Sequence, residues 1–287
     1  MDPFDPRLTP ARPDLAAARL KGVVAADRYV EGTPARVIEA VAPLHRASRP
    51  DAGIDTEALW GETLHVYDED EEGWSWVQLD RDGYVGWMPA HAILKGEAPA
   101  PTLRVATLAT FVYPDLTIKR PPLARLSFLS PVRPIGEREA NGRRFVVTAE
   151  GGAIVADHLE PIDARRPDPV AVAESFLGLP YLWGGRSSLG IDCSGLVQTA
   201  LSACGLACPR DTDQQETGLG EAVPLDPTRW RRGDLLFWPG HVGLVRDAES
   251  FVHATGHTMT VTIEGLTEGL ARIEAAGSPL RSVRRVL

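Results

Sequence analysis

Residues 185–203 change abruptly from loop to helix, and the change fixes the position of a cysteine. The segment reads GRSSLGIDCSGLVQTALSA, and the apolar residues after Cys193 recur at the spacing of one helix face. The glycine and serine residues before Cys193 favour a loop, so the helix must begin close to it. A helix start favours a thiolate and presents unpaired backbone N–H groups to an oxyanion. The pattern therefore predicts a nucleophilic thiol on the first helical turn.

Composition limits the class of protein. The 287 residues are 44% hydrophobic and 24% charged, which is typical of a soluble globular chain. A formal net charge of −9 disfavours nucleic acid or an anionic membrane as the main partner. The chain begins without a basic segment followed by an apolar run, and its three cysteines suit a reducing compartment. We expect a cytoplasmic protein with neither nucleic-acid nor membrane partners.

The first 163 residues show two sets of short alternating apolar runs, which predict small β-barrels. Residues 1–35 are rich in proline and predict an arm with one short helix at 14–20. Residues 36–97 hold runs at 36–41, 62–67, 74–79 and 84–88, separated by acidic or glycine turns. Residues 98–163 hold runs at 104–108, 124–129, 145–148 and 153–155, with a hairpin signal at Asn141-Gly142. We expect the second barrel to be the more diverged.

Residues 164–287 predict a mixed domain with helices first and a sheet afterwards. A short helix is expected at 170–177, followed by the helix that begins near Cys193. Four short strands are then expected at 234–238, 241–245, 250–254 and 259–263, with connections tight enough for an antiparallel meander. This order is typical of an α+β domain.

Two histidines can complete the chemistry of Cys193. A cysteine nucleophile needs a nearby base, and the base needs an orienting partner on its other ring nitrogen. His241 opens one expected strand and His253 lies within the next, so antiparallel pairing can bring their side chains together. The predicted order is nucleophile Cys193, base His241 and orienting residue His253.

Six ordered motifs in residues 168–287 resemble those of NlpC-type cell-wall cysteine peptidases, which have a papain-like fold. They are LPYLWGG at 179–185, DCSG at 192–195, PRDT at 209–212, RGDLLF at 232–237, HVGLV at 241–245 and FVH at 251–253. The stretches GWSWVQL at 73–79 and DGYVGWMP at 82–89 are similar to the strand pair of bacterial SH3-like domains. The resemblance implies a multidomain chain of two all-β SH3-like barrels followed by an α+β papain-like catalytic domain.

With SH3-like modules before the catalytic domain, the chain most resembles γ-D-glutamyl-L-diamino-acid endopeptidases of the dipeptidyl-peptidase VI type. That resemblance implies hydrolysis of murein-derived peptides during cell-wall recycling, by acyl-enzyme chemistry and without a cofactor. It implies that carboxylates and a tyrosine hold the free amine of an N-terminal L-Ala. The residues implied in substrate binding are Asp55, Tyr84, Tyr181, Trp183, Asp192, Ser194, Asp211 and Thr212.

Other functions fit parts of the same pattern. A thiol amidase or acyltransferase would use the same nucleophile on another amide, and a non-catalytic peptidoglycan-binding protein would use only the barrels. Zinc binding lacks support, because the three cysteines show no paired Cys-x-x-Cys spacing. We therefore expect no metal. The sequence leaves open whether the diamino acid is diaminopimelate or lysine, and how many copies assemble.

Overall fold

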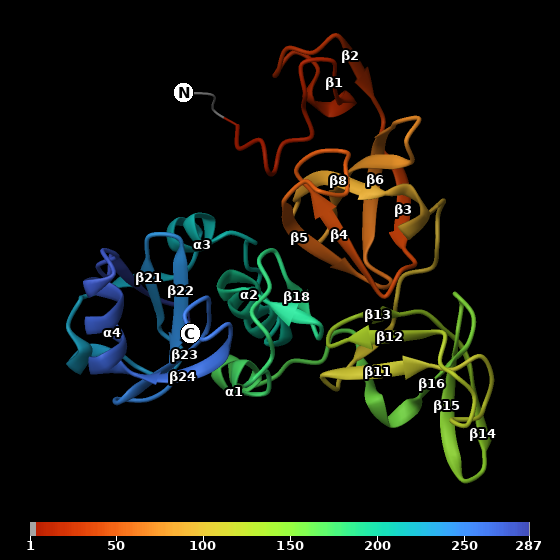
Figure 1. The fold of residues 1–287 in the computed structure, drawn as a ribbon. Coiled ribbons are helices and arrows are strands. Elements are labelled where there is room, and N and C mark those ends of the chain that lie inside the picture. Colours follow the sequence, from red (N-terminus) through yellow and green to blue (C-terminus); the bar gives the residue numbers. More distant parts are fainter. Residues whose placement is uncertain (1–3, 287) are drawn as a thin grey trace. The chain divides into compact units, whose positions relative to one another are not determined.

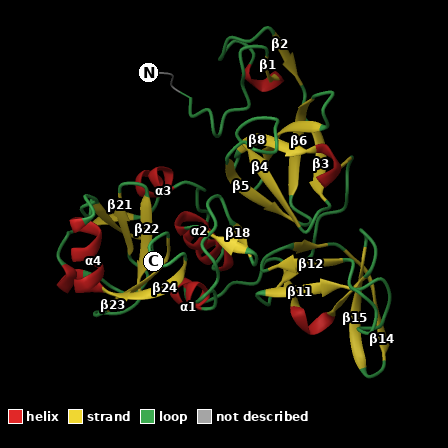
Figure 2. Ribbon diagram, viewed as in Figure 1, coloured by secondary structure: helices red, strands yellow, loops and turns green. Residues whose placement is uncertain are grey.

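The computed structural model describes residues 4–286 and divides the chain into two compact units, residues 1–162 and 163–287. Unit 1 is built from strands and short 3₁₀ turns, whereas unit 2 combines α-helices with a six-stranded sheet (Figures 1 and 2). This is the multidomain architecture that the sequence predicted.

Seven strands form the first barrel of unit 1, in the order β5-β4-β8-β7-β6-β3-β9. Its core holds apolar side chains that alternate along these strands, among them Leu44, Leu64, Val77 and Met88. The sequence patterns indicated four of the strands and missed others, including β4 and β5. The strands are β3 (Thr33–Val37), β4 (Val41–His45), β5 (Ile54–Leu59), β6 (Thr63–Glu69), β7 (Trp74–Leu79), β8 (Val85–Pro89) and β9 (Ile93–Lys95), with the turn η2 (Ala90–Ala92) before β9.

The arm before this barrel is extended, so the helix predicted at 14–20 is wrong. Strand β1 (Leu15–Ala17) pairs in parallel with β2 (Arg28–Val30), and only η1 (Ala18–Leu20) forms one short 3₁₀ turn. Leu15 is fully buried against Trp76, and the Arg12 guanidinium lies 4.4 Å from the Trp76 ring. Packing on the barrel and the cation–π contact thus outweigh the helix propensity of an alanine-rich segment.

The second barrel is built from short strands around Val105, Val112, Leu126 and Ile154. Its longest hairpin turns at Asn141-Gly142, where φ is 50° and 69°, so both residues have the positive φ that the predicted tight turn requires. The strands are β10 (Leu103–Val105), β11 (Ala109–Val112), β12 (Ala124–Ser127), β13 (Pro131–Val132), β14 (Pro134–Ala140), β15 (Arg143–Thr148), β16 (Ala153–Val155) and β17 (Leu159–Pro161), with η3 (Ala156–His158) before β17.

Unit 2 has a six-stranded antiparallel sheet, and Figure 1 shows α2 (Cys193–Ala203) and α4 (Leu266–Ala275) on its opposite sides. The predicted meander is confirmed as β21 (Leu235–Trp238), β22 (His241–Val245), β23 (Ser250–Thr255) and β24 (Thr260–Gly265). Two strands were not predicted: β20 (Glu221–Val223), and β25 (Ser282–Arg285), which inserts between β20 and β21.

The helices of unit 2 begin at recognisable caps. Asp168 caps α1 (Pro169–Glu174), and Asp192 caps α2, whose start at Cys193 was predicted. Helix α3 (Thr212–Gly218) begins with a capping box of Asp211 and Gln214, and neither α3 nor α4 was predicted. The remaining elements are β18 (Arg186–Ser187), β19 (Gly190–Ile191) and η4 (Pro227–Arg229). Among residues 4–286, no helix is long and apolar enough to span a membrane.

Candidate active site

Cys193 is the first residue of α2 and is 5% exposed. The Asp192 side chain accepts a hydrogen bond from the Gly195 N–H at 2.7 Å, which occupies one of the free donors of the first turn. Asp192 also accepts from the Gly184 N–H at 2.8 Å, so it ties the preceding loop to the same turn. The cap therefore sets both the start of the helix and the position of the thiol.

A buried ion pair holds this cap in place. Arg210, 1% exposed, donates from Nη1 to Asp192 Oδ1 at 3.0 Å and from Nη2 to Oδ2 at 2.7 Å. Its Nη1 also donates to Ser194 Oγ at 2.8 Å. This bidentate geometry gives both orientation and strength. Arg210 was not among the predicted site residues, although it stands within the PRDT motif that was singled out.

The two predicted histidines form a hydrogen-bonded pair. His241 opens β22, His253 lies within β23, and Nε2 of His241 is 2.9 Å from Nδ1 of His253. The ring of Trp238 lies 5.4 Å from the His241 ring, and that of Phe251 lies 4.6 Å from the His253 ring. His253 is fully buried, whereas His241 is partly exposed. Because Nε2 of His241 faces His253, its Nδ1 is the nitrogen left for the thiol.

The thiol lies beside the start of β22. Cys193 Sγ is 4.0 Å from the carbonyl oxygen of Gly240, and the N–H of Val242 donates toward the same sulfur. These two residues flank His241 in the chain, so the backbone at the predicted base lies beside the predicted nucleophile. The hydroxyl of Thr212, the first residue of α3, also hydrogen-bonds to the sulfur.

Burial keeps the reacting groups neutral. It raises the pKa of the Cys193 thiol to about 11, with the Asp192 carboxylate acting in the same direction. Burial lowers the pKa of His241 to about 4 and that of His253 to about 3. The sequence predicted a thiolate favoured by the helix start, but loss of solvent outweighs the helix dipole and the local donors. The resting site therefore pairs a thiol with a neutral imidazole.

The residues predicted to bind substrate are placed differently from one another. Thr212 touches the thiol, and Asp211 precedes it at the start of α3. Tyr181 is half-buried beside Cys193, and burial raises its pKa, with the nearby Cys193 and Asp192 contributing. Trp183 is 67% exposed. The Asp192 carboxylate and the Ser194 hydroxyl are buried in hydrogen bonds with Arg210, which gives both a structural role.

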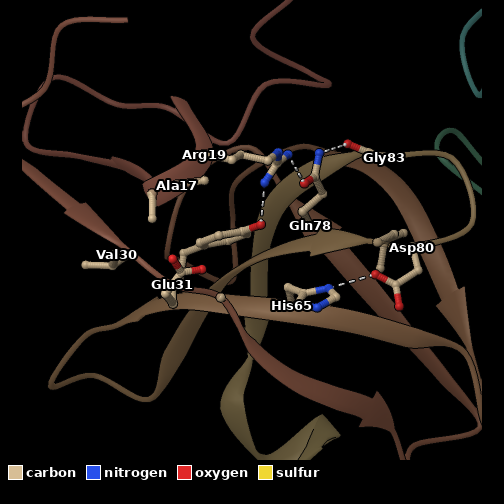
Figure 3. A pocket seen from close by; sticks show the side chains of 12 residues that line it. Ala17, Arg19, Val30, Glu31, His65, Gln78, Asp80 and Gly83 are labelled. Carbon is tan, nitrogen blue, oxygen red and sulfur yellow. Dashed lines mark hydrogen bonds and ion pairs between the residues drawn. The ribbon is translucent and has the colours of Figure 1, made fainter. Parts of the chain in front are cut away.

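Asp55 and Tyr84 belong to unit 1. Asp55 forms an ion pair with Arg46 at 2.6 Å, and Tyr84 is 3% exposed in the core of the first barrel. Their assignment to substrate binding stays a prediction. Elsewhere in this unit, a pocket of about 450 Å³ lies between the arm and the barrel (Figure 3). Its polar side chains largely pair with one another: Arg19 donates to Tyr67 and Gln78, and His65 pairs with Asp80.

Within residues 4–286, no three histidine, cysteine or acidic side chains are grouped as a metal site would require. The described cluster is instead that of nucleophilic catalysis: a thiol at a helix start, an imidazole beside it and a second imidazole that orients the first. The backbone N–H of Cys193 lies where a helix offers unpaired donors, so it can receive an oxyanion. Such a set suits acyl transfer from an amide.

Comparisons with known proteins agree with this chemistry. The NlpC/P60 family model matches residues 178–274, which contain the cysteine and both histidines, and the model of the bacterial dipeptidyl-peptidase Sh3 domain matches residues 44–93. The gamma-D-glutamyl-L-lysine dipeptidyl-peptidase of Bacillus subtilis is 33% identical over 76% of this chain and 78% of its own. The protein of the same name from Bacillus cereus is 27% identical over 64% of this chain and 60% of its own.

A solved structure shares the fold. The crystal structure of an NlpC/P60 family protein from Bacillus cereus covers 89% of this chain and 100% of its own, with a TM-score of 0.72 and 21% sequence identity. At this identity the likeness is one of fold. The similarity of fold covers most of the chain, whereas the two family models match only residues 44–93 and 178–274.

We expect Arg210→Met to destabilise unit 2 by about 3–5 kcal/mol, because it leaves the Asp192 carboxylate buried without its partner. Hydrogen exchange of α2 amides in the full chain, measured against urea, reports this loss. The matched control is Arg232→Met, which removes a more exposed ion pair to Asp168 and should cost no more than about 1 kcal/mol. Equal effects of the two substitutions would contradict the role given to Arg210.

Proposed function

Because this chain belongs to the NlpC/P60 family of cysteine peptidases, we propose that it hydrolyses the bond between γ-D-Glu and the diamino acid in murein stem peptides. The substrate would carry a free N-terminal L-Ala. A stem peptide gains that free amine only when it is released from its sugar, so the proposed role lies in cell-wall recycling. One observation carries the proposal: the Cys193, His241 and His253 cluster lies in a chain related across three quarters of its length to gamma-D-glutamyl-L-lysine dipeptidyl-peptidase.

The geometry suggests how the reaction would run. The Cys193 sulfur attacks the γ-carbonyl carbon while its proton passes to Nδ1 of His241, and the oxyanion meets the N–H groups at the start of α2. The C–N bond then breaks, and the amine of the diamino acid leaves with the proton from His241. Water, activated by the same imidazole, cleaves the thioester and frees the thiol. His253 stabilises the transient imidazolium through its hydrogen bond to Nε2.

The neutral resting state of the Cys193 thiol and the His241 imidazole determines when the proton is transferred. Since burial holds the pKa of Cys193 at about 11 and that of His241 at about 4, thiolate and imidazolium are not preformed in the unliganded protein. Proton transfer therefore accompanies attack on the carbonyl. A bound substrate provides the carbonyl carbon to which the sulfur bonds. The negative charge then develops on the carbonyl oxygen and does not remain on the sulfur.

Recognition of a free amine fits the surroundings of the thiol. Asp211 adjoins Thr212 in the chain, and the Thr212 hydroxyl touches Cys193, so Asp211 is the neighbour of a residue that contacts the nucleophile. A carboxylate desolvated by a bound ammonium ion is well paired, whereas an acylated amine leaves it unpaired. The proposed specificity follows from that difference.

We expect L-Ala-γ-D-Glu-diaminopimelate to be cut at least about 100-fold more efficiently than its N-acetylated form, measured as kcat/KM by chromatography of the released amine. A difference of this size corresponds to about 3 kcal/mol, the cost of a buried, unpaired charged group. Cys193→Ala should abolish both reactions. Equal cleavage of the two peptides would favour a thiol amidase of another specificity, and no cleavage of either, together with peptidoglycan binding, a non-catalytic protein.

Asp211→Asn is expected to lower kcat/KM for the free-amine peptide about 10- to 100-fold, because it removes the negative charge and keeps the shape. The rate on the acetylated peptide should change little. Asp213→Asn is the matched control, since Asp213 is an exposed carboxylate on the same helix. If Asp211→Asn slows both peptides equally, Asp211 supports the fold of α3 and does not read the amine.

The pH profile should reflect the buried imidazole. Because the pKa of His241 is lowered to about 4, the base stays neutral above that pH and is lost as pH falls through it. We therefore expect kcat/KM to be half-maximal near pH 4, where an ordinary imidazole would place the acid limb near 6.5. Steady-state rates at pH 3–8 measure this, with circular dichroism confirming folding at each point. An acid limb near 6.5 would show that His241 is solvated when it acts.

A further inference from the structure

A carboxylate lies behind the second histidine of the site. His253 is fully buried, and its Nε2 lies 3.3 Å from Oε2 of Glu264 on β24. Glu264 sits diagonally across from His253 on the same face of the sheet, because β23 pairs with β24 at Phe251 and Glu264. Glu264 was not among the predicted site residues.

An arginine fixes the orientation of this carboxylate. Arg272 on α4 donates from Nε to Glu264 Oε1 at 2.6 Å and from Nη2 to Oε2 at 2.7 Å. The bidentate pair holds the plane of the carboxylate. The side chain of Glu264 is 20% exposed, so Arg272 reaches it from the solvent side while His253 lies beneath it. Two elements, β24 and α4, thus cooperate to aim one carboxylate at a buried ring nitrogen.

The position of the protons on both rings follows from this contact. A carboxylate accepts hydrogen bonds and donates none, so it favours the proton of His253 on Nε2. The Nδ1 of His253 is then an acceptor, and the nitrogen 2.9 Å away, Nε2 of His241, must carry its own proton. A neutral His241 protonated on Nε2 has its lone pair on Nδ1, the ring nitrogen that is not engaged with His253. The opposite arrangement of protons would block the base.

We propose that Glu264, held by Arg272, is a positioning residue that sets the tautomers of His253 and His241 and thereby leaves Nδ1 of His241 free to take the Cys193 proton. No proton moves onto Glu264 in this step. The proton passes from sulfur to Nδ1 of His241, whose Nε2–H remains donated to His253, and His253 keeps its own Nε2–H toward the carboxylate. This inference rests on the proposed function of the same site.

The charges around the pair explain why both Glu264 and Arg272 matter. The charged groups that act on the histidines are Glu264 from β24 and Arg272 from α4, and His257 acts on Glu264. The rings of Trp238 and Phe251 pack against His241 and His253. Glu264 raises the pKa of His241 and Arg272 lowers it, so the two effects oppose each other. Loss of the arginine alone should therefore raise the pKa of the base, whereas loss of the carboxylate alone should not.

The direct test is the protonation of the histidine ring nitrogens, read from long-range ¹H–¹⁵N spectra of the full chain without substrate. In the wild type we expect protons on Nε2 of both His241 and His253, with Nδ1 of each unprotonated. A proton on Nδ1 of His253 would overturn the proposal. This measurement needs no activity, so it decides the inference even if the proposed peptide is not a substrate.

Glu264→Gln makes the test sharper, because an amide of the same shape can turn its NH₂ group toward His253 and stabilise the opposite tautomer. We expect a new population with protons on Nδ1 of both rings. We also expect kcat to fall about 10- to 100-fold with KM within about twofold, the size seen when a partner that orients an imidazole is removed. Glu264→Asp, which keeps a carboxylate, should restore the wild-type tautomers and part of the rate.

Glu174→Gln is the matched control, since Glu174 also pairs with arginines in unit 2, is 26% exposed and takes no part in the histidine pair. It should leave kcat and the spectra unchanged. Arg272→Gln should move the acid limb of kcat/KM to higher pH. Unchanged tautomers and rate in Glu264→Gln, or an unshifted acid limb in Arg272→Gln, would overturn the proposal. If the wild type cuts no peptide while its spectra are as expected, the proposed function fails and the inference stands.

Discussion

The ion pair between Asp192 and Arg210 lies beneath the first turn of α2, and the position of the nucleophile depends on it. One carboxylate caps the helix, ties down the preceding loop and receives a bidentate guanidinium. These tasks are compatible because the two carboxylate oxygens together can accept several hydrogen bonds. Without the cation, a buried negative charge beside the sulfur would oppose the thiolate that must form during attack. The pair is therefore structural in its contacts and electrostatic in its effect on Cys193.

The same arrangement recurs at the other end of the site. Glu264 lies beside His253 as Asp192 lies beside Cys193, and each carboxylate is matched by one arginine that was not foreseen from the sequence. Each carboxylate orients the hydrogen-bond donors around it, because it only accepts hydrogen bonds. Its arginine offsets the negative charge that the carboxylate places near the reacting groups. The acidic side chain thus orients the reacting groups, and the arginine sets the net charge beside them.

Local patterns predicted the parts of the fold that are locally determined. The start of α2 at Cys193 and the meander β21–β24 follow from a helical period, a cap and tight turns. Strand β25 was missed because its partners lie far away in the chain, and the arm was mistaken for a helix because burial of Leu15 on the barrel overrides an alanine-rich propensity. The motifs singled out the cysteine and the two histidines, and the structure shows the histidines as a hydrogen-bonded pair. Arg210 and Glu264 were not assigned, because a sequence does not show which charged residue meets another charged or polar group in the fold.

The site must keep Cys193 and His241 neutral without substrate and must stabilise charges during the proposed reaction. The arrangement of its side chains serves both requirements. A buried thiol and a partly buried, neutral imidazole avoid the cost of desolvating ions while no substrate is bound. Attack on a carbonyl then creates an oxyanion and an imidazolium together, and each arises where a fixed partner already points. The N–H groups at the start of α2 face the developing oxyanion, and the chain from His241 through His253 to Glu264 faces the developing cation. Because these partners are held by helix caps and ion pairs, little reorganisation is needed when the charges appear. The burial that suppresses a resting thiolate thus also strengthens every interaction that stabilises the transition state.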